Sequence, residues 1–255
     1  MASTQREGAS VLGVRVDRTS YAEASQLVAS WAGDGAARYV CVANVHTTIV
    51  ARSDTDFRGV VNAADLVTSD GMPLVWMLRL LGARRAGRVY GPTLMLHICE
   101  EAARQGLEVG FYGGTPVAVR AMVTRLTQQF PSLRVSYAFA PPFRELTEAE
   151  DAAVVEDVLA SGTRILFVGL GCPKQERWMA RHRERLPLVQ VGVGAAFAFH
   201  SGSVRQAPGW LQSLGLEWLF RLAMEPRRLW RRYLSTNPRF VMLALMQLLR
   251  LRRFD

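Results

Sequence analysis

The stretch from Ala64 to Trp76 carries the residue best placed for acid–base chemistry. A short apolar segment runs into Ser69-Asp70-Gly71, and an amphipathic helix pattern follows. Ligands of open α/β sheets bind beyond the carboxyl ends of the strands, so Asp70 would lie within reach of a substrate, on a corner that Gly71 relaxes. A carboxylate there can remove a proton from a substrate hydroxyl. The alternative is that Asp70 caps the helix, a role that Asp often has.

Two further segments have the features of anion-binding loops. Arg88 to Thr93 precedes a helix pattern, and Val109 to Pro116 joins a strand to a helix through a Gly113-Gly114 pair. Because the amides at a helix N-terminus attract anions, these two turns predict phosphate binding. The clearest strand pattern of the chain, Arg164 to Gly171, runs into Cys172-Pro173-Lys174-Gln175-Glu176 and another helix.

The composition favours an anionic partner. The 255 residues include 31 Lys and Arg against 22 Asp and Glu, a formal net charge of +9, and most of the positive charge is arginine. Arginine suits bidentate phosphate contacts, so nucleic acid, anionic lipid and a sugar nucleotide are all compatible partners.

Cysteine usage and hydropathy indicate the compartment. The three cysteines have no metal-ligand spacing and form no even disulfide set, which is typical of a reducing environment. The first ten residues lack the apolar core of a signal peptide, and no apolar run reaches the roughly 18 residues of a membrane span. We therefore expect a cytoplasmic protein.

Strand and helix patterns alternate along the first 209 residues. Tyr39 to Ala43 and Arg164 to Gly171 are continuous apolar runs, as strands buried on both faces are. Val11 to Val16 is predicted as one short strand. The alternation predicts an α/β fold, a Rossmann-like parallel sheet with helices on both faces, in a domain spanning residues 1–209.

From about Trp210 the pattern is helical only, and we expect residues 210–255 to form a basic amphipathic helical appendage. Pro226 opens one helix, and a second begins near Pro238 and ends in Arg250, Arg252 and Arg253. On a helical wheel, four arginines fall on one side and four apolar residues on the other: Arg227, Arg228, Arg231 and Arg232 against Leu229, Trp230, Tyr233 and Leu234.

Such helices lie well on anionic membranes, so a membrane surface is an expected partner. An ordinary packed helix and a contact between copies of the chain, as in a homo-oligomer, are the alternatives.

Other motifs are weaker. Gly169 to Lys174 and Gly192 to Phe197 each resemble half of a dinucleotide fingerprint but lack its third glycine, which gives a nicotinamide oxidoreductase weak support. Asp54-Thr55-Asp56 has the form of a metal-binding Asp-x-Asp, but its helix pattern favours a solvated face. The four histidines lack metal-ligand spacing. A non-catalytic basic module is another alternative, although it leaves a carboxylate among anion-binding loops unexplained.

An ordered set of motifs resembles the WecG/TagA/CpsF glycosyltransferases from about residue 10 to residue 240. The set is Asn44, Ala64-Asp65-Leu66-Val67, Asp70-Gly71, Arg88-Val89-x-Gly91, Gly113-Gly114, Gly169-x-Gly171-x-Pro173-Lys174-Gln175-Glu176, Gly194-Ala195-Ala196-Phe197, Leu216-Glu217-Trp218, Glu225-Pro226-x-Arg228-Leu229 and Arg232-Tyr233. The resemblance implies an inverting, metal-independent enzyme of cell-surface polysaccharide synthesis. It would move a sugar, commonly of N-acetylmannosamine type, from a UDP-sugar to an undecaprenyl-diphosphate-linked acceptor. No cofactor, metal or nucleic acid is expected.

The resemblance also implies residue roles. Asp70 is the candidate general base, Asn44 and Gln175 line the pocket, and Arg88 is a pocket arginine. The other expected substrate-binding residues are Gly113, Gly114, Gly171, Lys174, Glu176, Arg228 and Arg231. The C-terminal helices correspond to an appendage that meets the inner face of the cell membrane and helps to close the site. Three positions differ from the family pattern and bear on the donor sugar: Val42, Ala198 and Gln206 stand where Thr, Asp and Arg are usual.

Overall fold

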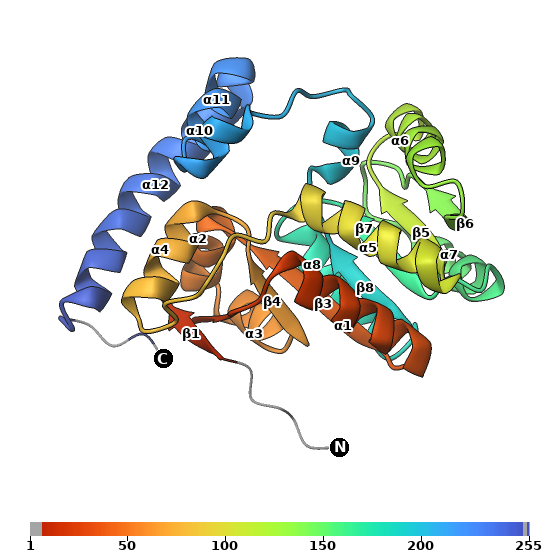
Figure 1. Cartoon of the computed structure of the whole chain (residues 1–255), viewed down its shortest axis with the longest axis horizontal. Helices are drawn as coiled ribbons and strands as arrows, with labels where there is room; N and C mark the ends of the chain where they lie inside the picture. Colours follow the sequence, from red (N-terminus) through yellow and green to blue (C-terminus); the bar gives the residue numbers. More distant parts are fainter. Residues whose placement is uncertain (1–6, 252–253, 255) are drawn as a thin grey trace. The chain divides into compact units, whose positions relative to one another are not determined.

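The computed structural model describes residues 7–251 and 254, and its main element is a parallel sheet of six strands. The strands lie in the order β4, β3, β8, β7, β5, β6, with helices flanking them (Figure 1). This arrangement confirms the predicted Rossmann-like α/β fold. The strands are β3 (Arg38–Ala43), β4 (Leu66–Ser69), β5 (Glu108–Gly113), β6 (Arg134–Phe139), β7 (Ile165–Gly169) and β8 (Val189–Gly192).

The chain forms two compact units. The first comprises the described residues up to Ser20, residues 42–90 and the described residues from Gln206 onward. The second comprises residues 21–41 and 91–205. The C-terminal helices therefore belong to the same unit as the segment that carries Asp70. The expected domain boundary at residue 210 stays a prediction.

In the second unit, helices cover both faces of the strands. Phe111 and Tyr112 are neighbours on β5, so their side chains point to opposite faces. Phe111 contacts Phe197 with ring centroids 5.9 Å apart, and Tyr112 stacks on Trp178 at 4.5 Å. The helices are α1 (Tyr21–Asp34), α5 (Gly91–Gln105), α6 (Pro116–Gln129), α7 (Glu148–Ala160), α8 (Lys174–His182) and α9 (Ala196–His200).

The first unit begins with an antiparallel hairpin of β1 (Gly8–Val11) and β2 (Val14–Asp17). The prediction of a single strand from Val11 to Val16 is therefore wrong. Leu12 and Gly13 have φ values of 54° and 89°, and two successive left-handed residues reverse the chain in a two-residue turn. The helices that follow are α2 (Val45–Ser53), α3 (Thr55–Asn62) and α4 (Met72–Leu80).

The C-terminal segment contains α10 (Gly209–Ser213), α11 (Glu217–Met224) and α12 (Pro226–Leu248). Pro238 lies inside α12, so the predicted division into two helices at this residue is wrong. A proline removes one helical hydrogen bond, but the buried face continues on both sides of it and packs against α2. That packing stabilises a continuous helix. The buried residues are Leu229, Thr236, Phe240, Leu243 and Ala244.

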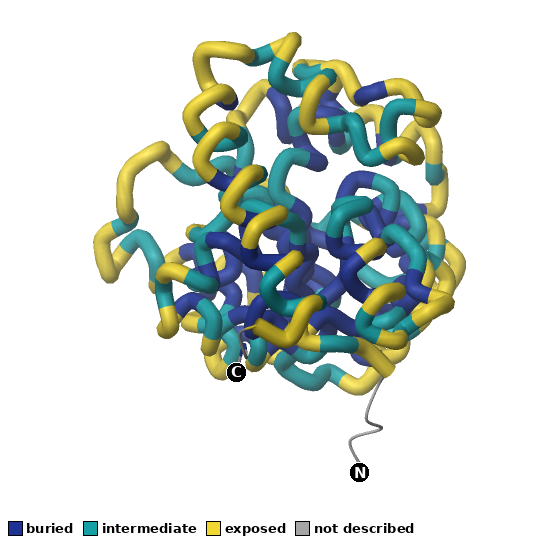
Figure 2. Tube along the Cα trace, turned by 90° about the vertical axis from the view of Figure 1, so that its left-hand side faces the viewer, coloured by how far each residue is buried: buried dark blue, intermediate teal, exposed yellow. Residues whose placement is uncertain are grey.

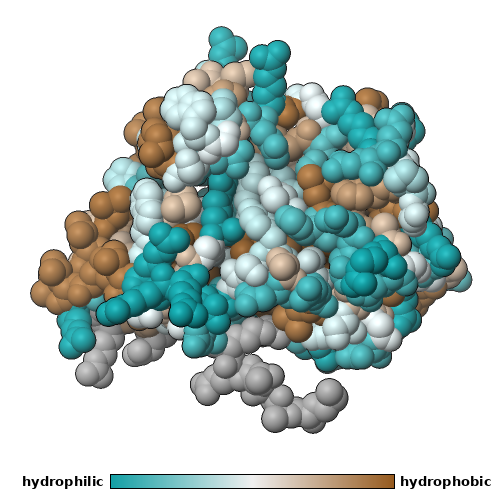
Figure 3. Space-filling view, in the orientation of Figure 1, coloured by the Kyte–Doolittle hydropathy of each residue, from teal (hydrophilic) through white to brown (hydrophobic). Residues whose placement is uncertain are grey.

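The outer face of α12 is partly apolar. Of the apolar residues predicted to share one side, Leu229 is buried whereas Trp230 and Leu234 are exposed. Figure 2 faces the side on which α12 lies, and Figure 3 shows hydrophobic side chains along its outer edge. Among the described residues, no helix is both long and apolar enough to span a membrane. Arg252 and Arg253, predicted at the end of this segment, lie outside the described residues.

Gly113 offers a test of how closely the strands approach one another in the second unit. Its φ is +133°, and a Cβ there would lie 2.5 Å from the carbonyl oxygen of Gly169. We expect Gly113→Ala to lower the free energy of unfolding by about 3 kcal/mol, because backbone strain and a steric clash add. Gly162→Ala is the control, since Gly162 also has a positive φ but open space around it, and should cost about 1 kcal/mol. If urea unfolding gives the two variants equal losses in the free energy of unfolding, the close approach of Gly113 to Gly169 is refuted.

Candidate active site

Asp70 lies directly after β4, at the carboxyl end of the strand. Its backbone N–H donates to the carbonyl of Ala43 at 2.8 Å, and its Oδ2 accepts a hydrogen bond of 3.3 Å from Asn44 Nδ2. Gly71, not Asp70, is the N-cap of α4, and among the described residues no side chain forms a capping hydrogen bond there. The capping alternative is therefore wrong. The expected role of Gly71 is wrong too, since its φ of −104° suits any residue.

Asn44 orients this carboxylate. Its Oδ1 accepts hydrogen bonds from the amides of His46 at 3.0 Å and Thr47 at 3.2 Å, so Asn44 is the N-cap of α2. With Oδ1 held in this way, the Nδ2 group points in a fixed direction, toward Asp70. The structure thus brings together Asn44 and Asp70, two of the predicted site residues, at the ends of the neighbouring strands β3 and β4.

Arg88 contacts the same corner and also the C-terminal segment. Its Nε donates to the backbone oxygen of Asp70, and its other two nitrogens donate to Gln212 at 3.1 Å and to the carboxylate of Glu217. The Tyr90 ring lies 4.2 Å from the guanidinium carbon. Although burial opposes it, the charges of Asp70 and Glu217 raise the pKa of Arg88. Arg88 is therefore a permanent positive charge beside Asp70.

Two arginines of the C-terminal segment, Arg221 and Arg232, are half-buried, and the Nε of Arg232 has no hydrogen-bond partner among the described residues. The helical wheel grouped Arg232 with three arginines that are exposed, and Arg221 was not among the predicted site residues. Burial, together with the charge of Arg232, lowers the pKa of His46 to about 4, so His46 is neutral near pH 7. Arg232 follows the buried Leu229 by three residues and precedes the buried Thr236 by four. A wheel centred on the buried face would have selected it.

The two appendage arginines predicted to bind substrate have other surroundings. Arg228 is exposed and donates to Glu225 at 2.5 Å, and the guanidinium of the exposed Arg231 lies 5.2 Å from the centre of the Trp230 ring. Their predicted role in substrate binding stays a prediction.

Glycines shape the strand ends of the second unit. Gly114, Gly171 and Gly194 all have positive φ values, and Gly114 N–H donates to the carbonyl of Gly169 at 3.2 Å. A Cβ on Gly169 would lie 2.9 Å from the ring of Phe197. The predicted glycine turns therefore form loops that bulkier residues could not make, and they bring backbone amides to the ends of β5 and β7.

Gln175 joins two of these loops. Its Oε1 accepts hydrogen bonds from Gly171 N–H at 3.2 Å and Gly194 N–H at 3.0 Å, and its Nε2 donates to Glu176 at 3.0 Å. Gln175 is buried, so this amide is a cross-link between the loop after β7 and the loop after β8. Its predicted contact with substrate stays a prediction.

Glu176 and Lys174 have contrasting environments at the start of α8. Burial raises the pKa of Glu176, and its Oε2 has no hydrogen-bond partner among the described residues. Lys174 is exposed at the first residue of the helix, whose N-cap, Pro173, supplies no capping hydrogen bond. The amides of this helix start and the ammonium of Lys174 could therefore hold an anionic group.

The Asp54-Thr55-Asp56 motif has a structural explanation. Asp54 caps α3, with its carboxylate accepting a hydrogen bond from the Phe57 N–H at 2.9 Å. The described residues include no cluster of three or more His, Cys, Asp or Glu that could hold a metal.

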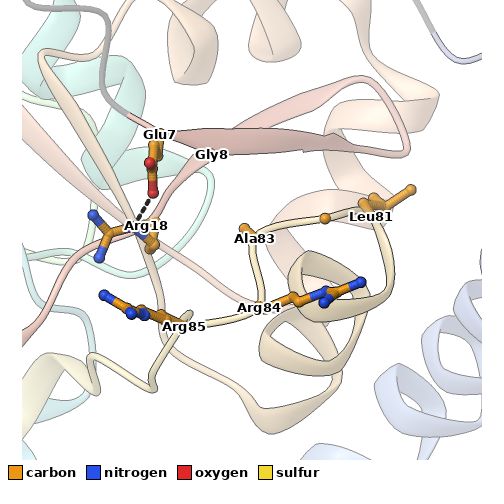
Figure 4. Close-up of a pocket in the computed structure, with 8 residues that line it drawn as sticks. Glu7, Gly8, Arg18, Leu81, Ala83, Arg84 and Arg85 are labelled. Atoms are coloured by element: carbon orange, nitrogen blue, oxygen red, sulfur yellow. Dashed lines mark hydrogen bonds and ion pairs between the residues drawn. The ribbon is translucent and has the colours of Figure 1, made fainter.

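A hollow in the first unit, between the start of β1 and the residues after α4, is lined by arginines (Figure 4). One of these, Arg18, is paired with Glu7 at 2.6 Å, and none of the predicted site residues lines it.

The fold is that of a Rossmann-like α/β protein. Its first unit has a carboxylate beside an arginine, and its second unit has glycine loops at the strand ends. Comparison with known families is more specific, since residues 9–254 match the glycosyl transferase WecG/TagA/CpsF family. The protein belongs to this family and is a glycosyltransferase. The binding-module and oxidoreductase alternatives thereby lose their support.

Two bacterial relatives share most of the chain. One is the N-acetylglucosaminyldiphosphoundecaprenol N-acetyl-beta-D-mannosaminyltransferase of Bacillus subtilis (strain 168), 26% identical over 207 residues, which are 81% of this chain and 78% of the relative. The enzyme of the same name from Bacillus spizizenii (strain W23) is 28% identical over 218 residues, 85% of this chain and 82% of the relative.

The burial of Glu176 predicts a pH-dependent stability. In the unfolded chain its carboxyl ionises near the ordinary value of 4.5, whereas the folded protein keeps the proton to higher pH. The folded state then binds more protons, so this group lowers the free energy of unfolding as pH rises above 4.5. We expect Glu176→Gln, a neutral isostere, to gain stability relative to wild type between pH 4 and pH 8 in urea titrations. Glu184→Gln, at an exposed position, is the control and should show no such gain.

Proposed function

We propose that the protein is an inverting, metal-independent glycosyltransferase with Asp70 as its general base. The donor is a UDP-sugar, most simply of N-acetylmannosamine type, and the acceptor is a sugar linked to undecaprenyl diphosphate. The observation that carries the proposal is the Asp70 carboxylate at the end of β4, oriented by Asn44 and adjacent to the positive charge of Arg88. The names of the two Bacillus relatives support the acceptor and the transferred sugar.

The reaction is a single displacement. An acceptor hydroxyl oxygen attacks the anomeric carbon while its proton passes to the Asp70 carboxylate. The bond from that carbon to the phosphate oxygen breaks, and UDP leaves with the electron pair. Attack from the side opposite the leaving group inverts the configuration.

The leaving diphosphate needs positive charge or N–H donors. The amides at the start of α8, the exposed Lys174 and the Gly113-Gly114 turn are the elements of the second unit that fit this need. We assign the stabilisation of the leaving UDP to these groups.

The C-terminal segment supplies the lipid-facing part of the proposal. We assign the half-buried Arg221 and Arg232 to the acceptor diphosphate, whereas Arg228 and Arg231 are exposed beside an apolar stripe. The stripe, Trp230, Leu234, Val241, Leu245 and Leu249, has the spacing of one helix face. Apolar residues flanked by arginine suit the surface of an anionic membrane, where the lipid-linked acceptor resides.

Replacement of Asp70 tests the base. We expect Asp70→Asn to fold normally, to bind the UDP-sugar within a few-fold of wild type, and to lose at least about 10²-fold in turnover. Turnover should be insensitive to excess chelator. Asp65→Asn, five residues earlier at the start of the same strand segment, is the matched control and should remain active. Near-normal turnover in Asp70→Asn would remove Asp70 as the base.

Two sets of arginine variants distinguish a membrane-binding role from a role in the active site. Charge reversal of both Arg228 and Arg231 should abolish sedimentation with anionic vesicles yet preserve turnover on a water-soluble acceptor, since each arginine near the surface contributes about 1 kcal/mol. Salt should weaken binding of the wild type to the same vesicles. Arg232→Ala, in contrast, should sediment with the vesicles like wild type and lose turnover even on the water-soluble acceptor. If the charge-reversed protein sediments like wild type, these arginines have no membrane role.

A further inference from the structure

The segment from Gly209 to Met224 has little hydrophobic packing to fix its position. Neither α10 nor α11 contains a buried residue. Several of its apolar side chains are exposed, among them Trp210, Leu214 and Leu219. Tertiary packing of an apolar face stabilises most helices in proteins, and here that contribution is small. Apart from the packing of α11 against α12, where the rings of Trp218 and Tyr233 meet edge-on at 5.8 Å, the position of the segment therefore depends on a few specific contacts.

Glu217 makes a charged contact of this kind. Its carboxylate pairs with Arg88, and both side chains are only 15% exposed. Gln212 accepts a second hydrogen bond from the same guanidinium, and Arg88 also donates to the backbone oxygen of Asp70. We call these four residues, Asp70, Arg88, Gln212 and Glu217, the Arg88 cluster.

The backbone beside the cluster also approaches α4 closely. A Cβ on Gly215 would lie 3.0 Å from the ring of Trp76 and 3.1 Å from the Cβ of Met72, and its φ is +70°. The turn between α10 and α11 thus lies against the helix that begins just after Asp70. Side chains and backbone of the segment therefore meet the same corner of the first unit.

The energetics favour a positioning role over a stabilising one. Desolvation offsets much of the attraction in a largely buried ion pair, so its net contribution to stability is small. Its geometry, in contrast, is well defined, because a planar guanidinium donates in fixed directions. Three of those directions are taken by Asp70, Gln212 and Glu217.

We propose that Glu217 is a positioning residue of the transferase. Through Arg88 it holds residues 209–224 against the corner that carries Asp70, and it thereby places Arg221, one turn further along α11, for the acceptor. The inference rests on the proposed function, because it assigns the cluster a part in transfer to the lipid-linked acceptor.

The experiment compares Glu217→Gln and Glu217→Asp with wild type in the full-length protein. Glu101→Gln is the matched control, since Glu101 is also 15% exposed and paired with an arginine, but on α5. We measure amide hydrogen exchange over residues 209–224, the affinity for UDP, and kcat and KM separately for the lipid-linked acceptor. Thermal melting checks that each variant is folded.

We expect exchange in residues 209–224 to become at least about tenfold faster in Glu217→Gln, because removing one partner leaves the largely buried charge of Arg88 without its counter-charge and local opening then requires less free energy. Transfer should fall about 10- to 100-fold in kcat/KM, because small misplacements are costly in catalysis. UDP affinity should stay within twofold of wild type, Glu217→Asp should recover most of the activity, and Glu101→Gln should match wild type.

Two results would overturn the proposal. Exchange in Glu217→Gln equal to that in Glu101→Gln would show that the residue does not hold the segment. Faster exchange with unchanged kcat and KM would make its role purely structural. If wild type itself transfers no sugar to the lipid-linked acceptor, the proposed function fails, and with it the assigned part in transfer, whereas the exchange data still decide whether Glu217 holds the segment.

Discussion

The candidate site of the first unit depends on the side-chain amide of Asn44. Its oxygen accepts hydrogen bonds from two backbone N–H groups in the first turn of α2, which prevents the side-chain amide from rotating. Its nitrogen donates to the Asp70 carboxylate. The orientation of the Asp70 carboxylate is therefore set by a helix cap rather than by a flexible side chain. Because the Asp70 N–H also donates to the carbonyl of Ala43, the backbone and the carboxylate of Asp70 are both tied to the end of β3.

A second amide has the corresponding part in the other unit. Gln175 accepts from the amides of Gly171 and Gly194, so two loops that follow different strands are joined by one buried oxygen. Its nitrogen needs an acceptor, and Glu176 provides it. Burial favours the neutral form of Glu176 and so removes the cost of an isolated buried charge. In both units, uncharged amides that bond to backbone N–H groups give the strand ends a defined shape.

The C-terminal helices show how one arginine-rich sequence can serve two environments. Arg232 is half-buried near the buried face of α12 and, together with burial, lowers the pKa of His46, whereas Arg231 is exposed. The two arginines differ by one residue, which changes the direction of a helical side chain by about 100°. Half-buried and exposed charges can therefore alternate along a single helix, and Pro238 does not interrupt the helix because packing against α2 continues past it.

The sequence by itself determined the parallel α/β fold, the strand-end position of Asp70 and the glycine turns, because strand burial, helix periodicity and left-handed glycines are local properties. It also determined the family, through an ordered set of motifs. Only the tertiary structure decided that Asp70 is not a cap, that Gln175 joins two loops, and that Arg88 pairs with Glu217, 129 residues later. It likewise decided which appendage arginines are half-buried. These outcomes depend on contacts between distant segments, and no local pattern records which partner a polar side chain will meet.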